Sequence, residues 1–320
     1  MTKALKDVHE KLQGVMKAVH TVVQGQEEVT EQILIALLTN SHALLESVPG
    51  LGKTTMIKAV ADALKLKFNR VQNTPDLMPS DITGTVMVYE RAGKQVLEFQ
   101  KGPIFTNIML ADEINRATPK TQAAMLEAMA EHQITVGGET YKLEEPFFVL
   151  ATQNPIDQEG TYPLPEAQTD RFLLKIFIDY PNTEAETRVV EMFATDVAKD
   201  KFRVPQVLDK ADVLQLQELT KQIPISKELM AQCVKLIQKT RSHDEIRIGA
   251  SPRASIGIVL AAKAHALLKG NNFVKRSDVA AVAKPVLRHR LMLTFNAEQE
   301  GKTTDTVIDE LVKANIKTKE

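Results

Sequence analysis

The sequence predicts an α/β domain built on a mostly parallel β-sheet, followed by a second, all-helical domain. In the first two-thirds of the 320 residues, short apolar runs alternate with segments of helical periodicity, which is typical of strands joined by crossover helices. After about residue 200 no further strand is expected, and apolar residues recur at amphipathic helical spacing. The chain is long enough for two hydrophobic cores, so we expect domains at residues 1–200 and 201–320.

Five apolar runs predict the strands of the sheet, at residues 43–45, 68–71, 108–111, 147–151 and 173–178. Helical periodicity predicts helices at 27–39, 53–64, 120–130 and 184–193. Two segments, 85–99 and 134–143, indicate β-hairpins that turn at residues 92–94 and at Gly137-Gly138. In the second domain we expect helices at 211–221, 227–239, 254–268, 277–287 and 306–315; Ser277 is expected to cap the fourth of these, and Gly270 to end the third.

Composition narrows the class of protein. Lys and Arg number 40 against 41 Asp and Glu, which argues against a protein that coats nucleic acid, although a local basic groove would survive such averaging. The single cysteine, Cys233, excludes a disulfide framework and a multi-cysteine zinc site, and its apolar periodic neighbours place it in a core. No stretch reaches 18 uncharged apolar residues, and the first 14 residues are rich in charge. We therefore expect a cytoplasmic protein without a membrane span.

The strongest local signal follows the first expected strand and opens a helix. It is the run Val48-Pro49-Gly50-Leu51-Gly52-Lys53-Thr54-Thr55. In a P-loop, small residues let backbone N–H groups wrap phosphates, the lysine reaches the outer phosphates, and the next hydroxyl binds Mg²⁺. Gly50, Gly52, Lys53 and Thr54 match those roles. The alternative is a glycine-rich turn that binds no ligand.

Ser47 stands where the P-loop pattern has its first glycine. The change costs little if the backbone there has ordinary dihedral angles, and about 1 kcal/mol if it needs a positive φ. Ser47 is therefore the main departure from the pattern, and it bears on how tightly nucleotide is bound.

Polar residues follow two other expected strands. Asp112 and Glu113 end the strand at 108–111, at the carboxyl edge of the sheet beside the phosphate loop. Asp112 would hold Mg²⁺, while Glu113 would act as the general base that polarises the attacking water. Asn154, just after the strand at 147–151, could hold the water or touch the γ-phosphate. Capped turns are the alternative for both strand ends.

Together these elements resemble the AAA+ ATPases, in which a sensor strand lies between the phosphate-loop strand and the Asp-Glu strand. Between about residues 25 and 291 the chain is similar to the MoxR family. The family's motifs occur in order as LMPSDITG (77–84), DEINRA (112–117), ATQNP (151–155), EAQTDRF (166–172) and GASPRA (249–254). The resemblance implies a P-loop AAA+ fold, with a parallel sheet sandwiched by helices and a helical lid domain.

The resemblance also implies roles for individual residues. Asn154 looks like the sensor-1 residue, and Arg253, at the start of a lid helix, like the sensor-2 arginine. Arg171 is similar to the arginine finger that reaches the γ-phosphate of a neighbouring subunit. From the residues alone, Arg171 could instead form a structural pair with Asp170, and Arg253 could be a solvated helix start.

An arginine supplied to a neighbour implies a closed ring, which is typically hexameric in the family. The resemblance further implies ATP and Mg²⁺ as cofactors, protein clients that are remodelled or matured, and partners that often carry a von Willebrand A domain. The family resembles the helix-2-insert branch of AAA+ proteins, so the two expected hairpins would project toward the ring axis and contact the client. The alternative is that the hairpins only decorate the sheet.

Two other functions remain open from the sequence. A nucleic-acid motor should have basic hairpins, but Arg91 and Lys94 are offset by Glu90 and Glu98, and residues 134–141 hold no Lys or Arg. A slow, nucleotide-dependent binding switch is suggested by Ser47. Arg116 has no assigned role. The run Arg288-His289-Arg290 could meet a neighbour's phosphates or an acidic interface, although a helix C-terminus that favours cations is the simpler account.

Overall fold

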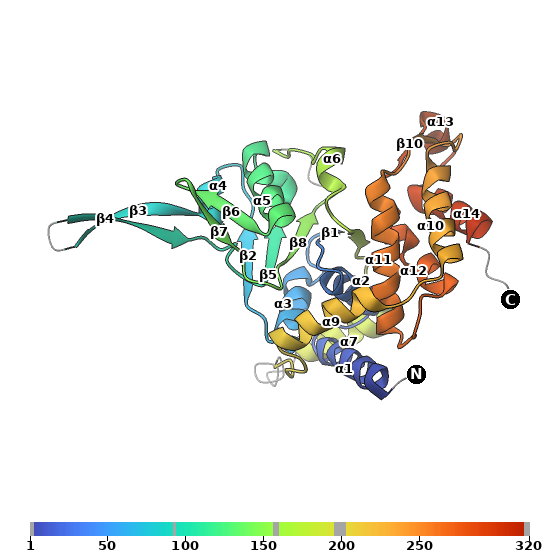
Figure 1. Ribbon diagram of the computed structural model, residues 1–320, viewed down its shortest axis with the longest axis horizontal. Helices are drawn as coiled ribbons and strands as arrows, with labels where there is room; N and C mark the ends of the chain where they lie inside the picture. The colour runs from blue at the N-terminus through green and yellow to red at the C-terminus, as the bar shows by residue number, and fades with distance from the viewer. Residues whose placement is uncertain (1–2, 92–93, 156–159, 195–202, 317–320) are drawn as a thin grey trace.

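The computed structural model describes residues 3–91, 94–155, 160–194 and 203–316 (Figure 1). Residues 92 and 93 of the first expected turn, and the expected domain boundary after residue 200, lie outside the described residues. Every expected strand, hairpin and helix is present, with ends within two residues of the expected ones. The sequence therefore predicted the order of these elements correctly.

The central sheet has five parallel strands, β1 (Ala43–Glu46), β2 (Phe68–Gln72), β5 (Ile108–Asp112), β8 (Phe148–Gln153) and β9 (Leu174–Phe177). Their order in space is β2-β5-β8-β1-β9, so β8 lies between the phosphate-loop strand β1 and the acidic strand β5, as expected. All pairings are parallel, with Leu45 opposite Thr152 and Gln72 opposite Asp112. This register aligns the carboxyl ends of the strands along one edge.

Helices cover both faces of the sheet because successive strand residues point to opposite sides. In β5, Ile108 and Leu110 pack into one core, and Met109 and Ala111 into the other. The first core receives α1 (Lys3–His20), α2 (Glu27–Leu38) and α3 (Lys53–Ala63), while the second receives α5 (Pro119–Glu131). The helix α1 was not expected, because its many charged residues mask a narrow buried stripe that includes Leu12, Val15 and Val19.

The helical domain contains α9 (Lys210–Gln222), α10 (Lys227–Thr240), α11 (Pro252–Leu268), α12 (Arg276–Leu287), α13 (Phe295–Gln299) and α14 (Thr304–Asn315). The expectation of no strands after residue 200 was wrong: β10 (Ile246–Ile248) and β11 (Met292–Leu293) form a small antiparallel pair. Strands of two or three residues are too short to leave a periodic pattern.

The ends of two helices test the capping predictions. Gly270, with φ +70°, follows the end of α11 and confirms the predicted stop. The Ser277 cap was wrong, because α12 begins at Arg276. The residue at the N-cap position is Lys275. Its backbone N–H donates a hydrogen bond to the carboxylate of Asp278 in the first turn of the helix (2.7 Å).

The two hairpins are β3 (Gly84–Arg91) with β4 (Lys94–Lys101), and β6 (Gln133–Val136) with β7 (Glu139–Lys142). The first projects away from the body of the molecule, on the side opposite the helical domain (Figure 1). At its base, Phe99 stacks on Tyr141 of the second hairpin, with ring centroids 4.1 Å apart. Gly84 is required there, because its φ is +100° and a Cβ would lie 2.3 Å from the carbonyl oxygen of Gln100.

A charged cluster joins the helical domain to the α/β core. His265 of α11 lies 3.2 Å from a carboxylate oxygen of Glu31 in α2 and 2.8 Å from one of Asp278 in α12. Lys269 also pairs with Glu31 (2.7 Å). Burial alone would lower the pKa of His265, but the hydrogen bonds and charges of Asp278 and Glu31 outweigh it and raise the pKa. The imidazolium is therefore stabilised in the folded protein.

This cluster makes part of the stability depend on pH. Because the folded-state pKa of His265 is raised above 6.5, its charged contacts contribute fully below that pH and are lost as the pH rises through the folded value. We expect His265→Gln to lower the free energy of unfolding by about 1–3 kcal/mol near pH 6, and by less at pH 9. Urea unfolding of both proteins at several pH values measures this, and a difference that grows toward high pH would contradict it.

None of the described helices combines the length and the apolar character that crossing a membrane requires.

Candidate functional site

The phosphate loop lies between β1 and α3. Gly50 has φ +87°, and Gly52, which caps α3, has φ +73°. A Cβ at either position would meet nothing within 4 Å, so the backbone conformation is what calls for glycine, and the space above the loop stays open. Lys53 and Thr54 begin α3, where backbone N–H groups have no partners inside the helix. These residues fit a chain of phosphates.

The backbone at Ser47 is ordinary. Ser47 does not belong to the residues with positive φ, and its N–H donates to the carbonyl oxygen of Gln153 (3.3 Å), which continues the pairing of β1 with β8. Its side chain is buried and donates to the carbonyl oxygen of Val48 (3.1 Å). Of the two cases considered from the sequence, the one with little cost therefore applies.

Asp112 ends β5 as a buried carboxylate held from both sides. Thr152 of β8 donates its hydroxyl to one carboxylate oxygen (2.6 Å). Arg70 of β2 donates to the other oxygen from Nε (3.2 Å) and Nη2 (2.7 Å). Sequence reasoning missed Arg70, because its place next to Asp112 follows from the register of β2 with β5 and from no local motif.

Glu113 follows in a left-handed backbone conformation, with φ +54°. Such a conformation is uncommon for a residue other than glycine and occurs often at functional sites. The backbone N–H of Glu113 donates to the Thr152 hydroxyl (2.9 Å). Its carboxylate accepts from Gln72 Nε2 (3.0 Å) and from Arg116 Nη1 (3.2 Å). Arg116, unassigned from the sequence, is thus a partner of Glu113, and Gln72 is a second residue that sequence reasoning missed.

Three neighbouring strands therefore end in polar residues at one edge of the sheet. Lys53 and Thr54 follow β1, Asp112 and Glu113 lie at the end of β5, and the buried Asn154 follows β8 between them. In open α/β sheets, ligands bind outside the carboxyl ends of the strands. In the part of the chain that the structure describes, no group of three His, Cys, Asp or Glu side chains could hold a metal alone. A magnesium ion held by Thr54, Asp112 and substrate phosphates fits this donor set.

The two arginines that the resemblance assigns to the γ-phosphate, Arg253 of the same subunit and Arg171 of a neighbour, contact protein groups in this structure. Arg253 is in the first turn of α11, where it is 59% exposed, and its Nη1 lies 3.7 Å from a carboxylate oxygen of Asp170. Arg171 is exposed and donates from Nη1 to the carbonyl oxygen of Leu126 in α5 (2.9 Å). No ion pair among the described residues joins Asp170 to Arg171, so the structure does not support the alternative in which these two form a structural pair.

The run at residues 288–290 points into the protein. Arg288 pairs with Asp305 through two hydrogen bonds (3.0 and 2.8 Å), and its guanidinium lies 4.2 Å from the ring centroid of Phe177. His289 contacts the carbonyl oxygen of Phe172 (3.0 Å), and burial, as the largest cause, lowers its pKa well below the usual value. Arg290 is buried against Asp170. The idea that this run meets a neighbour's phosphates is therefore wrong: it joins the helical domain to the core.

Comparison with known proteins agrees with this geometry. A model of the ATPase family associated with various cellular activities (AAA) matches residues 42–174, and a model of the AAA lid domain matches residues 238–311. Chaperone MoxR1 of Mycobacterium tuberculosis is 40% identical over 303 residues, which cover 92% of this chain and 79% of that protein. The chain belongs to the MoxR family of AAA+ ATPases.

Two further relatives match along nearly the whole chain. The uncharacterised protein YeaC of Bacillus subtilis is 42% identical over 97% of this chain and 95% of its own. The crystal structure of a candidate ATPase from Cytophaga hutchinsonii superposes with a TM-score of 0.90 and 39% identity, covering 99% of this chain and 97% of that one. As a MoxR-family AAA+ ATPase, the protein binds nucleotide and hydrolyses ATP, and its helical domain is the lid.

Proposed function

We propose that this MoxR-type ATPase hydrolyses ATP with Mg²⁺ at the interfaces between subunits of a ring, and that the motion of its lid remodels protein clients. The observation that carries the proposal is the meeting of the phosphate loop, the Asp112-Glu113 pair and Asn154 at one edge of the sheet. The proposal treats residues 1–200 as the nucleotide-binding domain and residues 201–320 as the lid domain.

In this proposal the residues at the carboxyl edge of the sheet have distinct roles in binding the phosphates and Mg²⁺. The backbone from Val48 to Gly52 wraps the phosphates, with Pro49 and Leu51 as spacers, and Thr55 continues the first turn of α3. Lys53 reaches the outer phosphates. Thr54 and Asp112 would hold Mg²⁺, which when bound neutralises charge on the phosphates.

The attack on the γ-phosphate involves the remaining residues. Glu113 takes the proton of the attacking water, Asn154 orients that water, and Arg253 binds the γ-phosphate from the lid. A neighbouring subunit supplies Arg171. Lid closure against the α/β domain would then exclude bulk water from the reaction.

The exposure of Arg171 supports a shared site, because an exposed guanidinium is available to a second subunit. An arginine donated to a neighbour implies a head-to-tail interface that closes into a ring, and we propose a hexamer. The name of the chaperone MoxR1 supports protein clients, to which we add a von Willebrand A domain protein as a partner. The single buried cysteine is consistent with work in the reducing cytoplasm.

The two rival functions lose support from particular contacts. In the projecting hairpin, Arg91 is paired with Glu98 (3.1 Å) rather than free for a nucleic-acid phosphate. DNA-stimulated hydrolysis that falls steeply with salt would nevertheless favour the motor. The binding switch was suggested by Ser47, and the ordinary backbone at that residue removes the reason for it.

Replacing Lys53 tests the nucleotide site. Lys53→Ala should weaken binding of a fluorescent ATP analogue with Mg²⁺ by about 10- to 100-fold, because a charge-assisted hydrogen bond to phosphate contributes about 1.5–3 kcal/mol. The matched control is Lys58→Ala, one turn further along α3, where the lysine is exposed and lies 3.5 Å from Asp62. Binding by Lys53→Ala as tight as that of the control would contradict the proposed site.

A further inference from the structure

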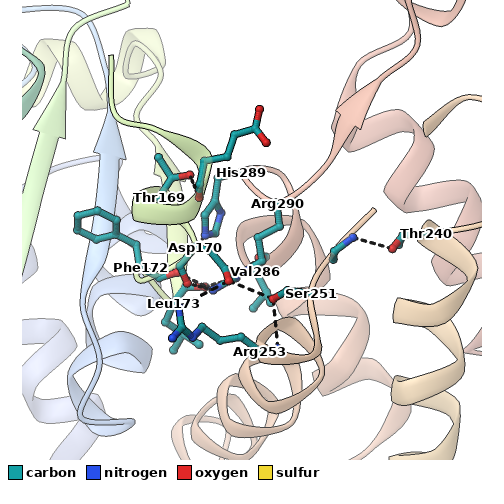
Figure 2. A network of polar contacts seen from close by, with 12 residues as sticks. Thr169, Asp170, Phe172, Leu173, Thr240, Ser251, Arg253, Val286, His289 and Arg290 are labelled. Carbon is teal, nitrogen blue, oxygen red and sulfur yellow. Dashed lines mark hydrogen bonds and ion pairs between the residues drawn. The ribbon is translucent and has the colours of Figure 1, made fainter. Parts of the chain in front are cut away.

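Asp170 lies between the core and the lid. It follows the short helix α6 (Glu166–Thr169) and directly precedes Arg171, and its carboxylate receives three side chains of the lid domain. Arg290 donates from Nε to one oxygen (2.7 Å), and Ser251 donates its hydroxyl to the other (3.0 Å). Arg253 lies beside that second oxygen at 3.7 Å. Figure 2 shows these side chains converging between the two parts of the molecule.

The ion pair between Asp170 and Arg290 is buried and supported by further hydrogen bonds. The Arg290 side chain is only 3% exposed, and it also donates to the carbonyl oxygens of Phe172 (2.6 Å), Leu173 (3.0 Å) and Val286. Burial lowers the pKa of Arg290, while the hydrogen bond and charge of Asp170 oppose that shift. A buried guanidinium without its carboxylate would be strongly unfavourable, so this pair is an anchor between lid and core.

The contact with Arg253 is of the opposite kind. Its guanidinium is 59% exposed and approaches Asp170 without a short hydrogen bond. Exposed ion pairs of this type contribute little to stability, so a phosphate with more than one negative charge can outcompete the carboxylate. Ser251 strengthens the arrangement, because its hydroxyl also accepts from the backbone N–H of Arg253 (3.2 Å) and so couples the cap of α11 to Asp170.

We propose that Asp170 is a positioning residue for ATP hydrolysis: through Arg290 it anchors the lid, and through its other oxygen it holds Arg253 ready and releases it to the γ-phosphate. The inference rests on the proposed function, because it assumes that Arg253 meets the nucleotide. It adds a residue that acts through Arg253 and does not itself touch the substrate. In this proposal the two arginines have different tasks: the buried Arg290 anchors the lid, and the exposed Arg253 binds the γ-phosphate.

The test compares Asp170→Asn with wild type at a temperature well below both unfolding midpoints. We expect kcat to fall at least about tenfold, with a smaller change in KM, because misplacing a group that acts in the transition state costs rate more than binding. In an Arg253→Ala background, Asp170→Asn should change kcat less than about twofold, since the two residues act as a unit. Asp170→Glu should recover part of the rate. Asp244→Asn, the same change at an exposed lid residue, is the matched control.

A second variant guards against misfolding. Asp170→Asn leaves Arg290 buried without a carboxylate, and the combination with Arg290→Met removes both charges, which folded proteins often tolerate. The double variant should regain thermal stability but keep the low kcat, because Arg253 still lacks its partner. A kcat that returns to the wild-type value along with stability would overturn the proposal.

The position of the lid provides a readout that does not need hydrolysis. Fluorescent labels at Lys58→Cys in α3 and Phe295→Cys in α13 report the distance between core and lid. Burial raises the pKa of the Cys233 thiol to about 11, so this thiol should not compete for the label. In the nucleotide-free protein, Asp170→Asn should broaden the distance distribution.

The outcomes separate the two ideas. If wild type binds or hydrolyses no ATP, the proposed function fails, and the labels still report whether Asp170 holds the lid. If wild type hydrolyses ATP and Asp170→Asn has the same kcat, or if its effect is undiminished in the Arg253→Ala background, the positioning role is wrong. If Asp170→Asn leaves the distance distribution unchanged, Asp170 does not anchor the lid.

Discussion

Glu113→Gln should lower kcat for ATP hydrolysis by about 10²–10⁴-fold, the usual contribution of a general base, while ATP still binds. Glutamine is nearly the same size and keeps an acceptor for Gln72 and Arg116, but it cannot take a proton from water. The left-handed backbone at residue 113 is retained, because the substitution is beyond Cβ. Steady-state phosphate release measures the loss, and titration with a fluorescent ATP analogue measures binding.

A matched change on the surface distinguishes chemistry from general damage. Glu127 is an exposed glutamate on α5, so Glu127→Gln should leave kcat unchanged. Equal rates in Glu113→Gln and wild type would exclude Glu113 as the base. If both rates were very low, the result would favour the slow binding switch over a motor.

Arg171→Ala should reduce hydrolysis by about 10³–10⁵-fold if the guanidinium completes a neighbour's site, which is the effect of an arginine finger in phosphoryl transfer. The fold should survive, because Arg171 is exposed and its side chain donates a hydrogen bond to the carbonyl oxygen of Leu126 in α5 rather than packing in the core. Arg188→Ala, an exposed arginine on α7 (Thr183–Ala194), is the control for loss of a surface charge. Thermal unfolding of each variant checks that only the rate has changed.

Mixing two inactive variants shows whether sites are shared. A subunit with Arg171→Ala keeps Glu113, and a subunit with Glu113→Gln keeps Arg171, so some interfaces of a mixed ring would contain both groups. We therefore expect partial recovery of hydrolysis on mixing. If light scattering demonstrates mixed oligomers and activity does not return, Arg171 does not act in a neighbouring site.

The contacts of Asp170 matter for interpreting the Arg171→Ala variant and the mixing experiment. Asp170 and Arg171 are consecutive, so the residue that positions Arg253 in one subunit also precedes the arginine offered to the next. Arg171 turns to α5, whereas Asp170 turns to the lid. The two side chains can therefore be replaced one at a time, and the effects of the lid and of the neighbour can be measured separately.

The secondary structure and the phosphate loop could be predicted from the sequence because both are local. Apolar alternation and helical periodicity reflect which face of each segment is buried, and Gly50 and Gly52 mark a loop that needs positive φ. Prediction failed where local patterns are weak or compete. The charged helix α1 was missed, β10 and β11 are too short to detect, and Asp278 rather than Ser277 completes the start of α12.

By itself the sequence determined the order of the strands and helices along the chain, the phosphate loop, the acidic pair and the family, since each is written in neighbouring residues. Only the tertiary structure decided which groups hold these residues in place. Arg70 meets Asp112 across 42 positions of the chain, and Arg290 meets Asp170 across 120. Contacts of that separation arise only when strand register and lid packing bring distant segments together, so no local pattern records them.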